Sequence, residues 1–333
     1  MKILKKKNKP DKNFVISAII TICFIAGLAG VYYLRNLGYS KDVILQKANN
    51  YFINERYFMA AKYYDKSYDL GASGAEFFRN YGIVLSKLGN YSSAEKYFQH
   101  SLEADGSNSE TYYCLGDAFY QKAVNSNNKD DFLQAARYLE KAISLAPDVE
   151  KSYLLIGLCY RSCAMQENAR AWYRRALLSG NFSQSGFYNL IGHTFREEER
   201  YLEAASYYKR AMESDYSFVA AYCNTGDMYV KLNDNASALT YYNKAIAVNP
   251  DFIVSYIKIG SIYFDQKLYN EAISWYLKAL SVNPDSDKAN YMLGLSYKEI
   301  GRINDAVEYL KKAAYCGSDD AIYELRNIGI ELR

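Results

Sequence analysis

Residues 253–286 read IVSYIKIGSIYFDQKLYNEAISWYLKALSVNPDS, and the order of small and large residues in this stretch decides the fold. Gly260 stands three residues before Tyr263, and Ala272 stands four residues before Tyr276. Residues three and four apart lie on one face of an α-helix. Each half of the stretch therefore predicts a helix with a small residue beside a large one. Because small residues let two helices approach closely, the aromatic side chain of one helix is expected to fill the space beside the other.

The same order of residues recurs along most of the chain. A glycine returns at intervals of 34, 41, 35, 34, 34 and 34 residues, at Gly82, Gly116, Gly157, Gly192, Gly226, Gly260 and Gly294. A second series begins with an alanine, at Ala60, Ala94, Ala135, Ala169, Ala204, Ala238, Ala272 and Ala306. Four residues after each alanine stands a large side chain, at Tyr64, Phe98, Leu139, Tyr173, Tyr208, Tyr242, Tyr276 and Leu310. A helix hairpin of this kind cannot bury its apolar face alone, so stacked neighbours are expected to form one continuous core.

This pattern resembles the tetratricopeptide repeat (TPR) family, whose period is 34 residues and whose signature runs W-x2-L-G-x2-Y…A-x3-F…P. Tyrosine or phenylalanine stands where the signature has tryptophan, at Phe78, Tyr112, Tyr153, Tyr188, Tyr222 and Tyr256. The resemblance covers residues 41–320 and implies an all-α fold, a right-handed superhelical solenoid of TPR helix hairpins. Its eight expected units are 41–74, 75–108, 109–149, 150–184, 185–218, 219–252, 253–286 and 287–320. Residues 321–333 are expected to form a C-terminal capping helix.

Two irregularities interrupt the period. The third unit has seven extra residues, and the polar run 124–131 predicts a longer turn between its two helices. One extra residue lies near Asn181, where the interval becomes 35. In the first unit Ala48 stands in place of the glycine, which suits a terminal repeat.

An apolar segment precedes the repeats. Residues 14–34 include no charged side chain, and 21 helical residues span a bilayer core of about 30 Å. Six lysines precede this segment, at Lys2, Lys5, Lys6, Lys7, Lys9 and Lys12. The positive-inside rule then predicts a basic cytoplasmic tail over 1–13, a transmembrane helix or uncleaved signal anchor over 14–34, and a repeat domain on the periplasmic side of the inner membrane. A signal peptide cleaved after Ala29 is the alternative, although the apolar run continues beyond that residue.

The cysteines favour the opposite topology. Five of them lie in the repeats without the spacing of a disulfide framework, at Cys114, Cys159, Cys163, Cys223 and Cys316. Free thiols are more typical of a reducing compartment. A cytosol-facing receptor or assembly factor therefore stays open beside the periplasmic prediction.

Composition and motifs argue against several classes of function. Residues 14–333 have 34 basic and 36 acidic side chains, so the composition does not support nucleic-acid binding by a basic face. The two histidines lie in different repeats and no Cys-x-x-Cys occurs, so no metal site is predicted. No phosphate-binding loop or nucleophile elbow is present. We therefore expect neither a cofactor nor an enzymatic activity, and we expect packing roles for Cys159 and Cys163.

The resemblance also implies where a partner would bind. Chaperone-type TPR domains hold a C-terminal carboxylate with lysine, asparagine and arginine side chains. Asn49 and Asn80 match that clamp, but Leu45, Glu110 and Cys114 stand where basic or polar partners are needed. Binding of such carboxyl tails is therefore disfavoured.

More generally, the first helices of TPR units line a concave groove for a protein or peptide. The corresponding positions in this chain are Arg79, Ile83, Tyr113, Asp117, Tyr120, Lys151, Leu154, Leu158, Arg161, Asn189, His193, Arg196, Asp227, Val230, Ile257, Ser261, Phe264, Tyr291 and Lys298. Mixed aromatic, aliphatic and charged groups suit an extended or helical polypeptide. The sequence thus predicts a membrane-anchored scaffold in bacterial cell-envelope assembly, with the regulatory subunit of an enzyme complex as a further alternative.

Overall fold

The computed structural model describes residues 41–147, 149–180 and 182–330. These residues form seventeen α-helices and include no strand, and they divide after Pro147 into two compact units. Unit 1 contains α2 (Lys41–Ile53), α3 (Tyr57–Asp69), α4 (Ala75–Lys87), α5 (Tyr91–Ala104), α6 (Ser109–Ser126) and α7 (Lys129–Leu145). Unit 2 contains α8 (Glu150–Ser162), α9 (Gln166–Ser179), α10 (Gln184–Glu197), α11 (Tyr201–Ser214), α12 (Val219–Lys231), α13 (Asn235–Val248), α14 (Ile253–Asp265), α15 (Tyr269–Val282), α16 (Asp287–Glu299), α17 (Ile303–Tyr315) and α18 (Asp319–Asn327).

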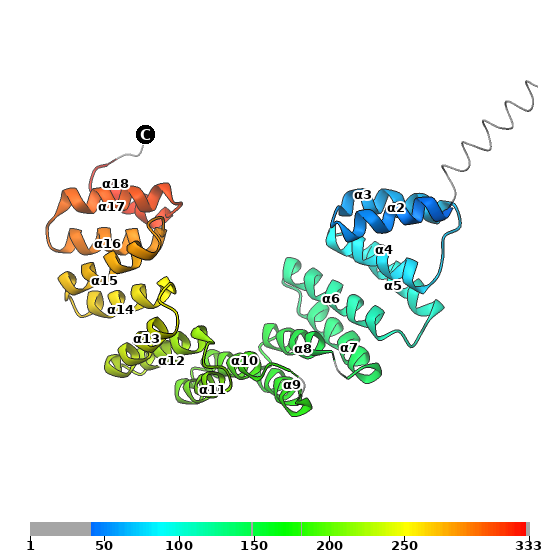
Figure 1. The fold of residues 1–333 in the computed structure, drawn as a ribbon, viewed down its shortest axis with the longest axis horizontal. Coiled ribbons are helices and arrows are strands. Elements are labelled where there is room, and N and C mark those ends of the chain that lie inside the picture. The colour runs from blue at the N-terminus through cyan, green and yellow to red at the C-terminus, as the bar shows by residue number, and fades with distance from the viewer. Residues whose placement is uncertain (1–40, 148, 181, 331–333) are drawn as a thin grey trace, which may run out of the picture. The chain divides into compact units, whose positions relative to one another are not determined.

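Within each unit the helices pair as hairpins that stack on the next pair (Figure 1). We call the even-numbered helices α2 to α16 the first helices and the odd-numbered helices α3 to α17 the second helices. Seven of the eight pairs lie inside the expected repeat boundaries, and α10 begins one residue early, at Gln184. After the last pair, α18 packs its buried Ala321 and Leu325 against α17. The all-α repeat architecture predicted from the sequence is confirmed.

The recurring glycines are contact points between the two helices of a hairpin. A Cβ atom on Gly226 would lie 2.5 Å from Cε1 of Tyr242, and one on Gly157 would lie 2.0 Å from Cε1 of Tyr173. Both rings are buried. Since carbon atoms pack at about 3.5–4.0 Å, only glycine leaves room for the ring. The predicted packing of a large side chain against a small residue is confirmed.

A residue in the left-handed conformation joins the two helices of most hairpins. Ala164, Glu199, Asn233 and Lys267 all have φ between 57° and 61° at this turn. At the same turn the N–H of Asp234 donates to the carbonyl of Tyr229, which satisfies an orphan carbonyl at the end of α12. The bond closes the turn without a glycine, although a left-handed conformation costs a non-glycine residue about 1 kcal/mol.

The longer turn predicted over residues 124–131 is wrong. The extra residues lengthen α6 and α7, and only Asn127 and Asn128 lie between the two helices. Asn127 adopts the left-handed conformation with φ 51°, and the side chain of Asn128 caps α7 by accepting from the N–H of Asp130 at 2.9 Å. Lys122 and Asp131 then form an ion pair of 2.8 Å across the turn. The run instead forms mostly exposed helix surface, with asparagines at the turn between the two helices.

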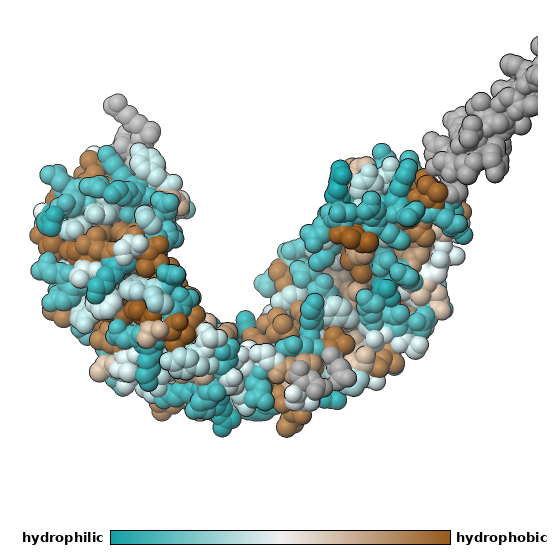
Figure 2. All heavy atoms as spheres, viewed as in Figure 1, coloured by the Kyte–Doolittle hydropathy of each residue, from teal (hydrophilic) through white to brown (hydrophobic). Residues whose placement is uncertain are grey.

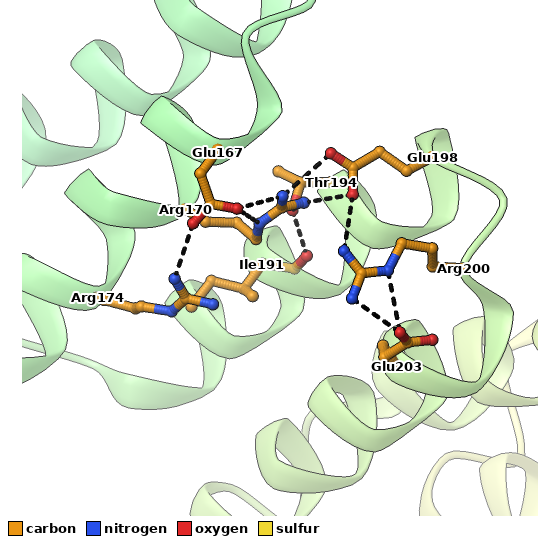
Figure 3. Close-up of polar contacts among 8 residues, drawn as sticks. All are labelled: Glu167, Arg170, Arg174, Ile191, Thr194, Glu198, Arg200 and Glu203. Atoms are coloured by element: carbon orange, nitrogen blue, oxygen red, sulfur yellow. Dashed lines mark hydrogen bonds and ion pairs between the residues drawn. The ribbon is translucent and has the colours of Figure 1, made fainter.

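A buried arginine joins α9 to α10, near the point where the period slips. The side chain of Arg170 is only 3% exposed, and its guanidinium donates to both carboxylate oxygens of Glu198, at 2.8 and 3.0 Å (Figure 3). Glu167 accepts from the same guanidinium at 2.6 Å. The guanidinium carbon also lies 4.4 Å from the centre of the Phe195 ring. Such a bidentate pair fixes the angle of approach of two helices.

The predicted membrane segment 14–34 and the basic tail 1–13 lie outside the described residues. Among the helices that are described, none is both long and apolar enough to cross a bilayer.

Candidate partner-binding surface

A groove of about 690 Å³ lies in unit 2 on the first helices α10, α12, α14 and α16, with Tyr242 of α13 at its base. Its apolar lining is Met228, Val230, Ile253, Val254, Ile257 and Ile262. Figure 2 shows hydrophobic residues in bands between hydrophilic ones over this part of unit 2. The lining thus combines apolar side chains with charged ones, a composition typical of sites that hold a peptide.

The charges along this groove are predominantly positive. Its lining includes four cations, Arg196, Lys231, Lys258 and Lys288, and two carboxylates, Asp227 and Asp265. Lys258 pairs with Asp227 at 3.0 Å. Among the described residues, neither Lys231 nor Lys288 has a carboxylate within ion-pairing distance, and the same holds for Arg196. Three cations of the groove therefore have no ion-pair partner among the described residues, although Lys288 lies 5.5 Å from the centre of the Tyr291 ring. The carboxylate of Asp265 likewise has no ion-pair partner there.

Several polar groups on the first helices are bonded to the tyrosines of their own hairpins. The hydroxyl of Tyr242 donates to Asp227 at 2.6 Å, and the hydroxyl of Tyr276 donates to Ser261 at 3.4 Å. In the first hairpin the hydroxyl of Tyr64 likewise donates to Asn49, which follows the small packing residue Ala48, at 2.6 Å. Each acceptor immediately follows that small residue in the sequence. These acceptors hold the core tyrosines and are only partly available to a ligand.

His193 occupies the same position in the fifth repeat. Its Nδ1 lies 2.9 Å from the Tyr208 hydroxyl, and its Nε2 lies 3.1 Å from Nδ2 of Asn189. Burial, together with the nearby Arg196 and Arg161, lowers the pKa of His193 to about 4. The imidazole is therefore neutral at physiological pH, so it does not add to the positive charge of the groove.

Comparison with known proteins agrees with this architecture. Models of the family described as TPR repeat match residues 226–267 and 260–301. Models described as tetratricopeptide repeat match residues 75–108, 128–185, 185–218 and 288–315. The chain is built from tetratricopeptide repeats. No curated protein sequence matches it.

Several solved structures resemble this TPR array. The C-terminal part of a TPR repeat-containing protein from Cytophaga hutchinsonii is 15% identical over 75% of this chain and 99% of that chain, with a TM-score of 0.59. MamA is 25% identical over 50% of this chain and 98% of that chain, with a TM-score of 0.43. In the Cut9–Hcn1 hetero-tetramer of the APC/C, the match is 15% identical over 87% of this chain and 56% of that chain, with a TM-score of 0.47. The first likeness shows the fold that the TPR array adopts.

The groove brings together only some of the side chains predicted from the sequence. The predicted residues that line it are Arg196, Asp227, Val230, Ile257 and Ser261. The predicted residues of unit 1 are Arg79, Ile83, Tyr113, Asp117 and Tyr120, all half-buried on α4 and α6. Arg79 pairs there with Glu110 at 3.2 Å, and burial together with Asp117 raises the pKa of Tyr113 to about 12.

The other predicted residues of unit 2 lie outside this groove lining. They are Lys151, Leu154, Leu158, Arg161, Asn189, His193, Phe264, Tyr291 and Lys298. Arg161 pairs with Glu197 at 3.3 Å, which links α8 to the end of α10. Lys298 pairs with Glu324 of α18 at 2.7 Å, so this lysine holds the capping helix.

Three lysines of the groove were missed by the sequence reasoning. Lys231 lies four residues after Asp227 on the same helix, and Lys258 directly follows Ile257. Lys288 occupies the second position of its repeat, which is also the position of Lys151 in the fourth repeat. Helical spacing could have revealed Lys231, because residues four apart share a face.

The cysteines of the TPR array are free thiols, and four of the five described lie partly or fully inside the helix packing. Burial raises the pKa of Cys159 to about 12 and that of Cys223 to about 11. A buried thiol with a raised pKa is a poor nucleophile at neutral pH. In the described part of the chain, no three His, Cys, Asp or Glu side chains are grouped so that they could hold a metal ion.

Proposed function

We propose that this protein is a scaffold whose unit 2 groove binds an acidic, partly apolar segment of a partner protein. The observation that supports it best is the set of free cations, Arg196, Lys231 and Lys288, beside the apolar lining. Apolar side chains such as Ile257 would provide buried area, and the lysines would attract and orient acidic residues of the ligand. Binding of this kind weakens as salt concentration rises, because the cations lie near solvent.

The scaffold needs no chemistry of its own, and we propose that it is not an enzyme. The polar groups that approach one another in unit 2, such as Tyr242 with Asp227 and Tyr208 with His193, hold tyrosine hydroxyls of the core. Their arrangement supports packing and recognition as the role of these side chains.

We also propose that residues 14–34 anchor the scaffold in the cytoplasmic membrane, with the repeats on its outer side. The support is the sequence itself, an uncharged apolar run after a lysine-rich tail. In a bacterium the scaffold would then serve assembly of the cell envelope. The free thiols favour a second candidate, in which the anchor is inverted and the repeats face the cytosol.

A photo-crosslinking experiment tests the groove. A photoreactive phenylalanine analogue replaces Ile257 in the full-length chain, and the crosslinked partner is identified in cells. Reversal of two charges, Lys231→Glu with Lys288→Glu, is expected to reduce that crosslink about tenfold, since two lost ion pairs are worth about 1.4 kcal/mol together. Lys141→Glu, an exposed residue on α7, is the matched control and should leave the crosslink unchanged. An equal crosslink in the reversed and control variants would count against the proposal.

A topology reporter tests the anchor separately. Alkaline phosphatase fused after Arg333 is active only if the C-terminus lies outside the cytoplasm. A fluorescent protein that folds only in the cytoplasm, fused at the same place, fluoresces only if the C-terminus lies inside it. Periplasmic phosphatase activity is expected. Fluorescence without phosphatase activity would favour the cytosol-facing candidate, and recovery of the full-length chain in the soluble fraction would contradict the anchor.

A further inference from the structure

The eighth repeat lacks an aromatic side chain that six repeats before it possess. At the fourth position of the first helix these repeats have Phe78, Tyr112, Tyr153, Tyr188, Tyr222 and Tyr256, whereas the eighth has Asn290. In four of the six, the ring packs on an aromatic side chain of the second helix. The centroid distances are 6.2 Å for Phe78 with Tyr97, 6.0 Å for Tyr153 with Trp172, 6.5 Å for Tyr188 with Tyr207, and 6.2 Å for Tyr256 with Trp275. The counterpart in the eighth repeat is Tyr309, which stacks on Tyr297 of α16 at 5.6 Å but has no second ring from the position of Asn290.

Asn290 reproduces the hydrogen bond of the missing tyrosine but not its volume. In the seventh repeat the hydroxyl of Tyr256 donates to the carbonyl of Pro250 at 3.0 Å. In the eighth, Nδ2 of Asn290 donates to the equivalent carbonyl, that of Pro284, at 2.9 Å, and to the carbonyl of Ser286 at 2.9 Å. Two carbonyl acceptors identify this atom as the amide nitrogen. The amide oxygen points away from them.

The amide oxygen of Asn290 has no hydrogen-bond partner among the described residues, although the residue is only 1% exposed. A buried polar atom without a partner costs about 1–3 kcal/mol, so most such atoms in proteins are paired. The unpaired oxygen and the missing ring occur at one residue. Together they define what this position would accept: an aromatic ring with a hydrogen-bond donor.

A hollow of about 440 Å³ lies where the ring is missing. Asn290 of α16 and Tyr309 of α17 line it, with Leu277 and Leu280 of α15 on another side. Lys312 lies over the Tyr309 ring at 4.6 Å and pairs with Glu308 at 2.7 Å. The lining also includes the carboxylate of Asp285, and the Lys312 ammonium is already paired. An uncharged aromatic group therefore fits this largely apolar hollow better than an anion.

We propose that this hollow binds a tyrosine or tryptophan side chain of a partner polypeptide. The sister repeats show what occupies the position: an aromatic ring packed on the second-helix aromatic. The incoming ring would contact Tyr309, and its O–H or N–H would donate to the amide oxygen of Asn290 after that buried side chain turns toward the hollow. Tyrosine and tryptophan are the side chains that combine a ring with such a donor. This surface is separate from the groove on the first helices, so it adds a second contact to the scaffold.

Small blocked amino acids test the proposal on the full-length chain. Saturation-transfer NMR compares N-acetyl-tyrosine amide, N-acetyl-phenylalanine amide and N-acetyl-leucine amide. The tyrosine and phenylalanine probes are expected to bind with millimolar affinity, the tyrosine probe more tightly, and the leucine probe at least tenfold more weakly than the tyrosine probe.

Two variants of one residue separate the contributions. Asn290→Tyr supplies the missing ring from the chain itself and is expected to weaken the tyrosine probe at least about tenfold. Asn290→Ala leaves the hollow open but removes the amide oxygen, so both aromatic probes should bind equally. Circular dichroism confirms that each variant is folded. Equal binding of the tyrosine probe to wild type and Asn290→Tyr would overturn the proposal.

Sedimentation identifies the source of the ring. If the wild type is a dimer that Asn290→Tyr dissociates, the occupant is a second copy of this chain and the foreign partner is refuted. If Asn290→Tyr leaves the oligomeric state unchanged, the partner assignment stands. The groove variant Lys231→Glu should not alter binding of the tyrosine probe, so failure of one surface is distinguishable from failure of the other.

Discussion

Gly192→Ala tests the contact on which each hairpin depends. A Cβ atom at this position would lie 2.5, 2.7 and 3.0 Å from Cε1, Cδ1 and Cζ of Tyr208, well inside the usual contact distance. The ring is 0% exposed and its hydroxyl lies 2.9 Å from Nδ1 of His193, so it cannot turn away without breaking that bond. Overpacking of this kind costs about 1–3 kcal/mol. Alanine gains about 1 kcal/mol over glycine in a helix, which leaves a net loss of up to about 2 kcal/mol.

Gly186 in the same helix is the matched control. No atom lies within 4 Å of a Cβ placed there, and the residue has ordinary helical backbone. Gly186→Ala should therefore stabilise the protein by as much as about 1 kcal/mol. The two variants have the same chemical change in one helix, and the difference in their free energies of unfolding isolates the ring contact, with an expected size of up to about 3 kcal/mol.

Urea denaturation of the full-length chain, followed by circular dichroism, measures the global effect of both variants. Because repeat arrays can unfold in parts, amide hydrogen exchange in α10 and α11 measures the local effect. The close-contact argument would be refuted if Gly192→Ala were as stable as Gly186→Ala by both measurements. A rescue provides an internal check: in a Tyr208→Ala background, Gly192→Ala should become neutral or stabilising.

Three further predictions concern other parts of unit 2. Glu198→Ala leaves the guanidinium of Arg170 buried with one partner fewer, so it should lower the free energy of unfolding by about 2–3 kcal/mol. Arg170→Met should lower it by about 1 kcal/mol or less, because the carboxylates of Glu167 and Glu198 reach water. Urea denaturation measures both variants. In the folded protein the pKa of His193 is lowered to about 4, so the unfolded state binds a proton at a higher pH than the folded state does. The free energy of unfolding should therefore fall as the pH decreases from about 6.5 to about 4, by at most about 3 kcal/mol. That loss should be absent in His193→Gln and present in His100→Gln, as measured by urea denaturation across this pH range. Asn290→Tyr should raise the free energy of unfolding by about 1 kcal/mol by filling the hollow, and thermal melting measures it.

The hairpins were predictable because their signal is periodic and local. A glycine such as Gly226 and an aromatic such as Tyr242 recur at a fixed spacing, and helical geometry alone places them on facing surfaces. The error over residues 124–131 has the opposite origin. Polar composition was interpreted as a turn, but a surface helix is also polar, and helices can extend until an asparagine caps them.

The candidate groove was only partly predictable, because the sequence does not show which polar side chains already have partners. Asp227 and Ser261 were predicted as ligand contacts, yet both accept hydrogen bonds from tyrosines of their own hairpins. Asn290 was visible as a departure from the aromatic pattern. Its unpaired oxygen and the adjoining hollow follow from the packing of three helices, which no spacing rule gives. The membrane anchor stays a prediction from the apolar run.

The chain has 36 tyrosines but only 15 phenylalanines and 2 tryptophans, and some of these tyrosines link the core of the TPR array to its candidate binding face. In four repeats the buried tyrosine of the second helix forms a hydrogen bond with a polar residue of the first helix, the one that directly follows the small packing residue. These polar residues are Asn49, His193, Asp227 and Ser261. Two repeats have Phe98 or Leu310 in place of that tyrosine, and there the neighbouring residues are the apolar Ile83 and Leu295. The third and fourth repeats depart from this rule, with Asp117 beside Leu139 and Leu158 beside Tyr173.

This coupling limits which residues can set partner specificity. Replacing Asp227 by an apolar residue would leave a buried tyrosine hydroxyl without its acceptor, at a cost of about 1–3 kcal/mol. Lys231 and Lys288 do not hold a buried group of the core in this way, since neither forms an ion pair within the described residues. Both can therefore change without loss of the fold. If the proposed groove binds a partner, we expect its specificity to depend chiefly on these exposed cations, because the tyrosine acceptors are bonded to the core.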